Sequence, residues 1–491
     1  MGNPQKASTP KGKVSVIKAA RRTLPMILIP GIMGSRLTHP PSNSLVWNPM
    51  GFPIGPDAWP LSPSIGFAAA RLRDIDNTLE PAHEFTHLND PLGTGDIGRA
   101  KRRHELAHHE RDDIHHAYGV VWPSYREFLL AMNFRLRSKL VGLGWNLYLD
   151  CFGYDWRRSN RENGVLLDAR VKEVTDACGG EKPVLVAHSM GGLVARSFIW
   201  GKRAGLNKVR KLVLVASPSL GATKPYCFLK TGIPTRPSQD PDLFDPVMLA
   251  VRNLLLKLTN ITLGDRKRDV AFLRRCFAMH ELSIKRLYAR HENVSWLTFK
   301  PADTGLDTRA ALSDGRPPQT GTSLLTAENT EVVYNDPTLG FTDFPIDRNS
   351  PLWRDRERSL DRFDAETMVF DSSGVPVRAK FHRDTTFFAS SSHKTHNQVD
   401  LTLKNVKHRS GENAFITKLE STAPDGAGDF SVPIGSALPK PNIRFPKPGQ
   451  ATYRKKSINA LHEGMCNHPT VIKLVTKLLV QQCKDDNKAG P

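Results

Sequence analysis

At 491 residues the chain is too long for one minimal core and long enough for a large domain with insertions. Its 39% hydrophobic and 24% charged residues are the balance of an ordinary globular protein, but 69 Lys and Arg against 49 Asp and Glu give a net charge of +20. The basic residues are spread along the chain without zinc-finger or RNP-like motifs, which argues against nucleic-acid binding. An anionic membrane surface suits this charge better.

The cysteines and the N-terminus indicate a cytoplasmic site of synthesis. The six cysteines are widely separated and form no CxxC pair, so we expect no disulfide framework. The apolar run at 24–29 is broken at once by Pro30 and Gly31 and is too short for a signal-peptide core. No segment reaches the ~18–20 apolar residues of a membrane span. We therefore predict no signal peptide and no transmembrane segment, so that any export follows a leaderless route.

Short apolar runs alternate with helical patterns over the first 216 residues, which is typical of βαβ units. We predict buried strands at 24–29, 145–149, 183–187 and 211–216, and helices over 124–142, 164–178 and 191–202. This alternation of strand and helix patterns stops after about 218. It resumes with a predicted strand near 385–389, and the last predicted element is a helix from Pro469.

The alternation of strands and helices predicts an α/β fold with a mainly parallel central sheet, helices on both faces and a large inserted cap or lid. The predicted parts are a basic N-terminal segment 1–22, a core made of 23–217 and 381–483, a cap or lid at 218–380, and a polar tail at 484–491.

The segment from Val184 to Gly192 (VLVAHSMGG) carries the chemistry. A buried strand runs directly into a small-x-Ser-x-Gly turn and then into a helix. The turn is so tight that only small residues fit two positions before and after the serine, here Ala187 and Gly191. The helix directs its N-terminal N–H groups at developing negative charge. We predict that Ser189 is the nucleophile of an α/β-hydrolase; the alternative is a serine that only caps the helix.

A serine nucleophile needs a histidine base that is oriented by a carboxylate, and in this fold the order along the chain is Ser, Asp or Glu, His. Two C-terminal segments fit. GDFSVP (428–433) holds Asp429 in a turn, with Asp425 as a rival just before it. HEGMCNHP (462–469) offers His462 and His468 directly before the last helix, where this fold places its base.

Several ordered motifs together resemble the lecithin:cholesterol acyltransferase-like family of lipases, which includes lysosomal phospholipase and phospholipid:diacylglycerol acyltransferases. The matching segments are PGIMGSRL (30–37), WNP (47–49), YDWR (154–157), HSMGG (188–192) and GDFSVP (428–433), the last resembling GDGTVP with Phe430 and Ser431 substituted. The resemblance covers about 24–220 and 385–480. The family commonly staples its lid with a disulfide near the tryptophan segment, but no cysteine precedes Cys151 here, so we expect the lid to be held differently.

Carried over by position, the resemblance implies Asp429 as the acid and His462 as the base. We prefer His462 to His468 because His468 and Pro469 look like the start of the final helix. The implied function is a serine lipase or phospholipase that hydrolyses or transfers acyl esters of lipids through an acyl-enzyme, without a metal or cofactor. Its expected partners are a lipid or phospholipid substrate and an anionic membrane surface.

The remaining site predictions concern the oxyanion and the substrate. The resemblance implies an oxyanion hole formed by the backbone N–H groups of Ile32 and Met190. Gly31, Trp47 and His188 are expected to bind substrate.

Three alternatives stay open at this point. His104 and His108 in HELAH fit the HExxH zinc pattern, although a solvated helix explains this His-rich segment more simply. The basic charge, the lipase motifs and the missing signal peptide also fit a secreted antibacterial effector with an immunity protein as partner. A non-catalytic lipid-binding relative would hold the predicted triad apart in space.

Overall fold

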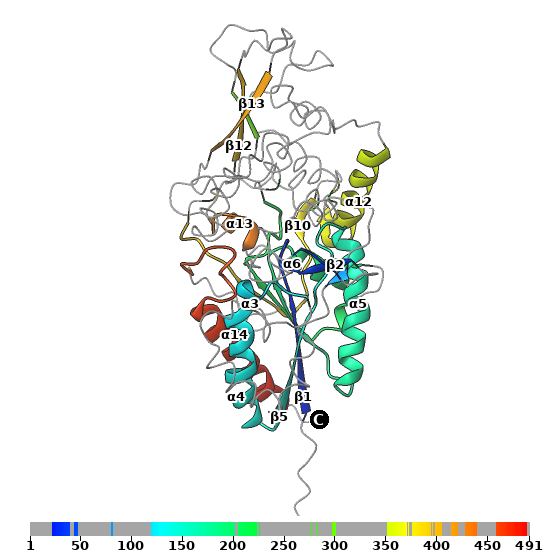
Figure 1. Cartoon of the computed structure of the whole chain (residues 1–491), viewed down its shortest axis with the longest axis vertical. Coiled ribbons are helices and arrows are strands. Elements are labelled where there is room, and N and C mark those ends of the chain that lie inside the picture. Colours follow the sequence, from blue (N-terminus) through cyan, green and yellow to red (C-terminus); the bar gives the residue numbers. More distant parts are fainter. Residues whose placement is uncertain are drawn as a thin grey trace, which may run out of the picture.

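The computed structural model describes residues 22–39, 44–47, 80–81, 119–201, 205–222, 225, 276, 281, 297–300, 351–370, 372, 376–393, 395, 398–404, 414–420, 428–438 and 458–488. In this part of the chain the core is a parallel sheet (Figure 1). It has five strands in the order β11-β7-β6-β1-β5. Its strands are β1 (Arg22–Ile29), β5 (Trp145–Cys151), β6 (Val184–His188), β7 (Lys211–Val215) and β11 (Thr385–Phe388).

The apolar runs that predicted these strands are buried on both faces of the sheet, as parallel strands require. Every residue of β6, β7 and β11 is buried. The five predicted strands are confirmed, with ends that differ by two residues at most.

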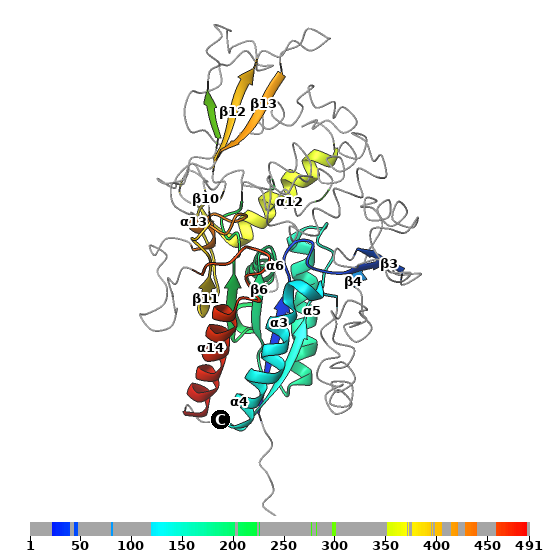
Figure 2. The ribbon, with the colours of Figure 1, turned by 60° about the vertical axis from the view of Figure 1, so that its left-hand side comes forward.

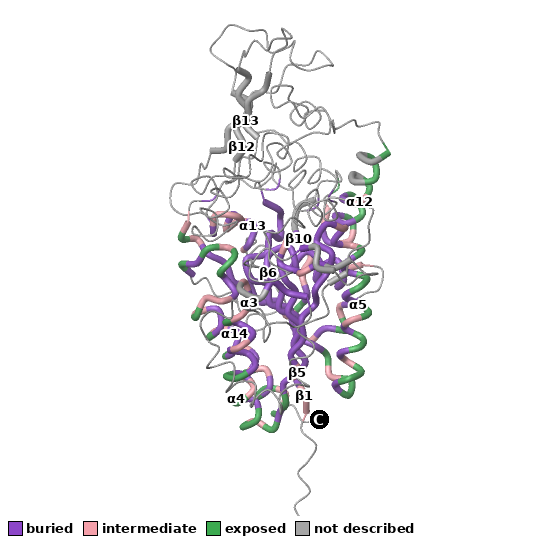
Figure 3. The backbone as a smooth tube through the Cα atoms, viewed as in Figure 1, coloured by how far each residue is buried: buried purple, intermediate pink, exposed green. Residues whose placement is uncertain are grey.

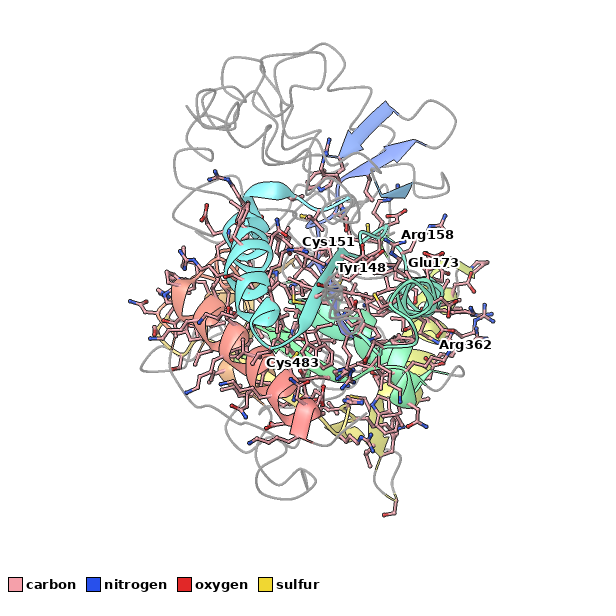
Figure 4. The ribbon with its side chains drawn as sticks, turned by 90° about the horizontal axis from the view of Figure 1, so that it is seen from below. Tyr148, Cys151, Arg158, Glu173, Arg362 and Cys483 are labelled. Carbon is pink, nitrogen blue, oxygen red and sulfur yellow. The ribbon has the colours of Figure 1, made fainter. Side chains whose placement is uncertain are left out.

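Helices cover both faces of the sheet, as predicted (Figures 1 and 2). Because strand side chains alternate in direction, Ile27 and Ile29 pack toward one face and Met26 and Leu28 toward the other. The first face carries α5 (Asn160–Ala177), α6 (Gly191–Trp200) and α12 (Pro351–Thr367), and the second carries α3 (Trp122–Ala131), α4 (Arg137–Val141) and α14 (Pro469–Lys488). Seen from below, Cys483 lies on the side of α14, and Glu173 and Arg362 lie on the opposite side (Figure 4).

Two helical predictions differ from the structure. The helix predicted over 124–142 contains a π-helical turn, Met132–Leu136, between α3 and α4. Asn133 is buried in this turn, and its Oδ1 accepts hydrogen bonds from Nε and Nη2 of Arg137 at 3.1 and 2.9 Å, which supports the wide turn. Helix α14 continues to Lys488, into the predicted polar tail, because Cys483 is buried and Asp486 pairs with Arg210.

Most of the predicted cap lies outside the described residues. Strand β8 (Leu297–Lys300) belongs to it, but pairs with β12 (Gln398–Lys404), which pairs with β13 (Ala414–Glu420). These three strands form a separate sheet, away from the central one (Figure 2). Residues 398–404 and 414–420, predicted as core, therefore lie outside the core, between β11 and the GDFSVP segment along the chain.

A buried arginine joins another part of the predicted cap to the core. The guanidinium of Arg196 on α6 donates hydrogen bonds to the backbone carbonyls of Ser219 at 2.8 Å, Thr367 at 2.8 Å and Lys380 at 3.1 Å. Thr367 ends α12 and Lys380 follows β10 (Pro376–Ala379), which pairs with β9 (Met368–Phe370). The C-terminal end of the predicted cap is thus continuous with the core.

Burial is concentrated in the sheet and the inner helix faces (Figure 3). The five cysteines among the described residues are buried, and Cys151, Cys178, Cys466 and Cys483 are free thiols. Within those residues, no helix is long and apolar enough to cross a membrane.

Glu281 anchors the predicted cap at the N-terminus of α5. Its carboxylate is buried and accepts hydrogen bonds from Ser159 Oγ at 2.7 Å, the Asn160 amide at 2.6 Å and Ser359 Oγ at 3.0 Å. Burial raises the pKa of Glu281 to about 7, although these hydrogen bonds oppose the shift. The folded protein therefore favours the protonated carboxyl more than the unfolded chain does.

The Glu281→Gln variant is expected to remove part of the pH dependence of stability. The Glu281 pKa is raised on folding from 4.5 to about 7, so its contribution is fully present below about pH 4.5 and is lost as pH rises through 7. Between about pH 5 and about pH 8 the wild type should lose about 2–3 kcal/mol of unfolding free energy relative to Glu281→Gln. Urea unfolding of both proteins at the two pH values measures this difference. Glu173→Gln, on the exposed face of α5, is the control, and a change as large in that variant would contradict the assignment.

Candidate active site

Ser189 lies in a sharp turn between β6 and α6. Its φ is +50°, in the left-handed region that costs a non-glycine residue about 1–3 kcal/mol. The turn is held on both sides, because the Ser189 amide donates to the Val215 carbonyl at 2.9 Å and the Gly192 amide donates to the Ser189 carbonyl at 3.0 Å. The strained conformation is thus imposed by the neighbouring strand and by the start of the helix.

Small residues around the turn are required by close backbone contacts. A Cβ atom on Gly191 would lie 2.5 Å from the carbonyl oxygens of both Ile29 and Pro30, at the end of β1. A Cβ atom on Gly31 would lie 2.9 Å from Cβ of Ser189. The glycine two positions after the serine therefore lets α6 approach β1, and Gly31 lets the following loop approach the serine.

Three side chains that the sequence analysis selected meet at this turn. The Nε2 atom of His462 lies 2.7 Å from Oγ of Ser189, and its Nδ1 atom lies 2.8 Å from Oδ2 of Asp429. The other carboxylate oxygen of Asp429 accepts the amides of Ser431 at 3.0 Å and Val432 at 2.7 Å. Three segments that are distant in sequence thus form one chain of hydrogen bonds.

Electrostatics favours an ionised Asp429. Burial alone would raise its pKa, but the charge of His462 and the hydrogen bonds from His462, Val432 and Ser431 outweigh it and hold the pKa below its usual value. An ionised carboxylate accepts the Nδ1 proton of His462, which leaves the Nε2 lone pair for the Ser189 hydroxyl proton. The geometry is that of a base poised to deprotonate a serine.

The loop that carries Asp429 is supported by the segment that follows β11. Phe430 has a φ of +76°, the conformation that glycine favours, at the position where the family's GDGTVP pattern has glycine. Thr395 Oγ1 accepts the Phe430 amide at 2.9 Å, and the ring of His393 stacks on the Phe430 ring with centroids 4.7 Å apart. Gly428 pairs with His393 through two backbone hydrogen bonds.

The rival base His468 does not join this arrangement. His468 is part of the start of α14, where its Nδ1 atom accepts the Thr470 amide at 3.2 Å and its carbonyl accepts the Ile472 amide at 3.1 Å. Asp425 and the HExxH segment at 104–108 lie outside the described residues.

The loop after β1 lies beside Ser189 and is held by two buried tyrosines. The Tyr125 hydroxyl accepts the Gly31 amide at 2.8 Å, and the Tyr154 hydroxyl donates to the Pro30 carbonyl at 2.9 Å. Among the described residues, no acceptor takes the amide of Ile32 or of Met190. Neither of these two amides, the predicted oxyanion-hole donors, is therefore hydrogen-bonded to a described residue.

The residues expected to bind substrate have other roles in the structure. Trp47 is buried, donates from Nε1 to the Met33 carbonyl at 3.0 Å and packs edge-on against Trp156. His188 is also buried, and both of its ring nitrogens have partners inside the protein. Gly31 lies close to Ser189, and its missing side chain lets the loop after β1 approach the serine. These contacts give all three residues a structural role; that they bind substrate stays a prediction.

The YDWR segment is likewise structural. Arg157 donates from Nε and Nη2 to the two carboxylate oxygens of Asp155 at 2.9 and 2.7 Å, and both side chains are buried. Because Tyr154 also donates to Pro30, this ion pair supports the loop beside Ser189. Sequence reasoning missed Tyr125, since a tyrosine on the buried face of a helix is indistinguishable from an ordinary core residue.

Comparison with known families confirms the predicted resemblance over part of the chain. The family model "Lecithin:cholesterol acyltransferase" matches residues 138–236. "Phospholipase A(1) LCAT3" of Arabidopsis thaliana is 36% identical over 88 residues, which are 17% of this chain and 20% of that protein. The match thus spans about a fifth of the relative's length.

A solved structure matches nearly the whole chain. "The crystal structure of Tle4-Tli4 complex" contains a chain that superposes with a TM-score of 0.56 at 17% identity, covering 94% of this chain and 99% of that one. Together with the parallel sheet and its two helical layers, this likeness confirms the predicted α/β-hydrolase fold.

Proposed function

We propose that this protein is a serine hydrolase of lipid acyl esters, with Ser189 as nucleophile, His462 as base and Asp429 as the orienting acid. The observation that carries the proposal is the unbroken hydrogen-bond chain from Ser189 Oγ to His462 Nε2 at 2.7 Å and from His462 Nδ1 to Asp429 Oδ2 at 2.8 Å. Such a chain activates a hydroxyl that is otherwise a weak nucleophile.

The reaction proceeds in two acyl transfers. His462 takes the Ser189 proton while the hydroxyl oxygen attacks the ester carbonyl, and the amides of Ile32 and Met190 stabilise the negative oxygen of the tetrahedral intermediate. The intermediate collapses when His462 gives its proton to the departing alcohol, which leaves an acyl-serine. Water or another alcohol then attacks the acyl-serine, again through His462, and regenerates the free enzyme.

A phospholipid is the substrate class that the comparisons support. The matched relative is named as a phospholipase A(1), and the matched family model is that of an acyltransferase acting between lipids. The net charge of +20 favours adsorption to anionic lipid surfaces. We therefore propose phospholipase A activity at an anionic membrane surface, with water or a lipid alcohol as acyl acceptor.

Purified wild-type protein should release fatty acid and lysophospholipid from phosphatidylcholine vesicles. Release should be faster when the vesicles contain phosphatidylglycerol, and this gain should shrink at high salt because salt screens the attraction between the protein and the surface. Mass spectrometry of the lipids measures both products, and an added lipid alcohol reveals acyl transfer as a new ester. Triacylglycerol emulsions provide the comparison substrate. Absence of ester cleavage in every one of these lipids would sink the proposal.

The antibacterial effector hypothesis uses the same chemistry in another biological role. The likeness to the chain from the Tle4–Tli4 complex is one of fold, at 17% identity, and does not favour this role over the main proposal. An immunity protein as partner therefore stays a prediction.

A further inference from the structure

A second chain of buried hydrogen bonds runs beside the proposed triad. The Gly31 amide lies 2.8 Å from the Tyr125 hydroxyl oxygen, and that oxygen lies 3.0 Å from Nδ1 of His188. The Nε2 atom of His188 lies 2.9 Å from the backbone carbonyl oxygen of His462. The chain thus begins in the loop after β1 and ends at the backbone of the proposed base.

The groups at the two ends of the chain restrict which atom donates in each of its hydrogen bonds. An amide can only donate, so the Tyr125 oxygen accepts from Gly31 and its own hydrogen is free for Nδ1 of His188. A carbonyl can only accept, so Nε2 of His188 carries the hydrogen that reaches His462. A neutral His188 ring in this chain is therefore the Nε2–H tautomer.

Burial supports this assignment. It lowers the pKa of His188 to about 3, with a further decrease from the charge of His462, and it raises the pKa of Tyr125 well above its usual value. Both groups therefore stay neutral at physiological pH, and the direction of the chain does not change when His462 takes up a proton.

The chain joins the two backbone segments that must be placed around Ser189. At one end, Gly31 precedes Ile32, the proposed oxyanion donor; at the other, His462 carries the ring that accepts the Ser189 proton. His188 is the residue directly before Ser189, and its ring lies against the His462 ring with centroids 5.1 Å apart. The same side chains thus contact both segments and the nucleophile turn.

We propose that Tyr125 and His188 are positioning residues. They hold the loop after β1, which contains the proposed oxyanion donor Ile32, and the proposed base His462 in their places beside Ser189. This inference rests on the proposed function. The two side chains lie outside the triad but affect the rate of the proposed reaction. Neither side chain touches substrate in this role. Their loss should therefore reduce kcat and leave KM for a small soluble ester nearly unchanged.

Two variants of one residue separate the two hydrogen bonds of His188. In His188→Gln the side-chain amide can reach the position of Nε2 and still donate to the His462 carbonyl. In His188→Asn the shorter side chain can reach only the position of Nδ1, so it keeps Tyr125 and loses His462. We expect His188→Asn to lower kcat for a p-nitrophenyl ester about 10²-fold, and His188→Gln to retain most of it.

The Tyr125→Phe variant tests the other end of the chain. It leaves the Gly31 amide and Nδ1 of His188 without their partner, and we expect kcat to fall about tenfold or more at constant KM. Because both residues act through one chain, the Tyr125→Phe/His188→Asn double variant should be little worse than its worse parent. Thr476→Val, which removes a buried hydroxyl bonded to the Ile472 carbonyl within α14, is the control for lost buried hydroxyls and should keep wild-type kcat.

Nitrogen-15 spectra of the histidine rings provide a readout that is independent of activity and of variant folding. In wild-type protein the His188 ring should show the Nε2–H tautomer and should not titrate between about pH 5 and pH 9. A charged ring or an Nδ1–H tautomer would overturn the proposal. So would folded His188→Asn and Tyr125→Phe proteins with wild-type kcat, or equal losses in the Gln and Asn variants. If the wild type cleaves no ester the proposed function fails, whereas an active wild type with unaffected variants refutes only the positioning role.

Discussion

Replacement of Ser189 with alanine is expected to lower kcat for ester hydrolysis about 10⁶-fold, because the oxygen that attacks the ester and carries the acyl group is lost. The remaining activity should be that of the oxyanion donors and of substrate binding alone. The fold should be retained, since alanine at a φ of +50° bears a strain similar to that of serine and the turn is held by backbone hydrogen bonds.

The measurement pairs kinetics with covalent labelling. Hydrolysis of a p-nitrophenyl ester gives kcat and KM, and a fluorophosphonate probe should label the peptide that contains Ser189 in the wild type and nothing in Ser189→Ala. The matched control is Ser197→Ala, a buried serine on α6 that lies against Gly164 of α5, and it should keep both activity and labelling. Circular dichroism and thermal unfolding show whether each variant is folded. Wild-type turnover by a folded Ser189→Ala protein would refute the nucleophile.

The parts of the fold that the sequence predicted are those with local causes. Strands β1, β6 and β7 are continuous apolar runs because both of their faces are buried, and such runs can be recognised without knowledge of their neighbours. The serine turn is equally local, since its small residues lie within two positions of Ser189. By contrast, β12 and β13 have the same patterns whichever sheet they join, so their pairing with β8 outside the core could not be predicted.

The site shows the same division between local and distant causes. Asp429 and His462 could be selected because the fold fixes their order along the chain and the family resemblance supplies their positions. The role of His188 could not be predicted, since its two partners lie 63 and 274 residues away in sequence. The contacts of Trp47 with Met33 and Trp156 could not be predicted either, because no pattern in the sequence reveals them.

His462→Ala and His468→Ala are expected to differ in activity about 10⁶-fold, although the two histidines are only six residues apart. His462 lies within hydrogen-bond distance of Ser189 Oγ and Asp429, so its removal leaves the nucleophile without a base. His468 contacts neither group; its ring accepts an amide in the first turn of α14.

The two variants should therefore show opposite defects. His468→Ala should keep wild-type kcat and lose about 1 kcal/mol of unfolding free energy, the usual effect of losing a helix-capping hydrogen bond. His462→Ala should remain folded, because its ring packs at the partly exposed edge of the site, and should be as inactive as Ser189→Ala. Kinetics with the soluble ester and urea unfolding of each variant test both halves of the expectation. The reverse pattern, with activity lost only in His468→Ala, would transfer the role of base to His468 and would require the loop before α14 to rearrange in the active enzyme.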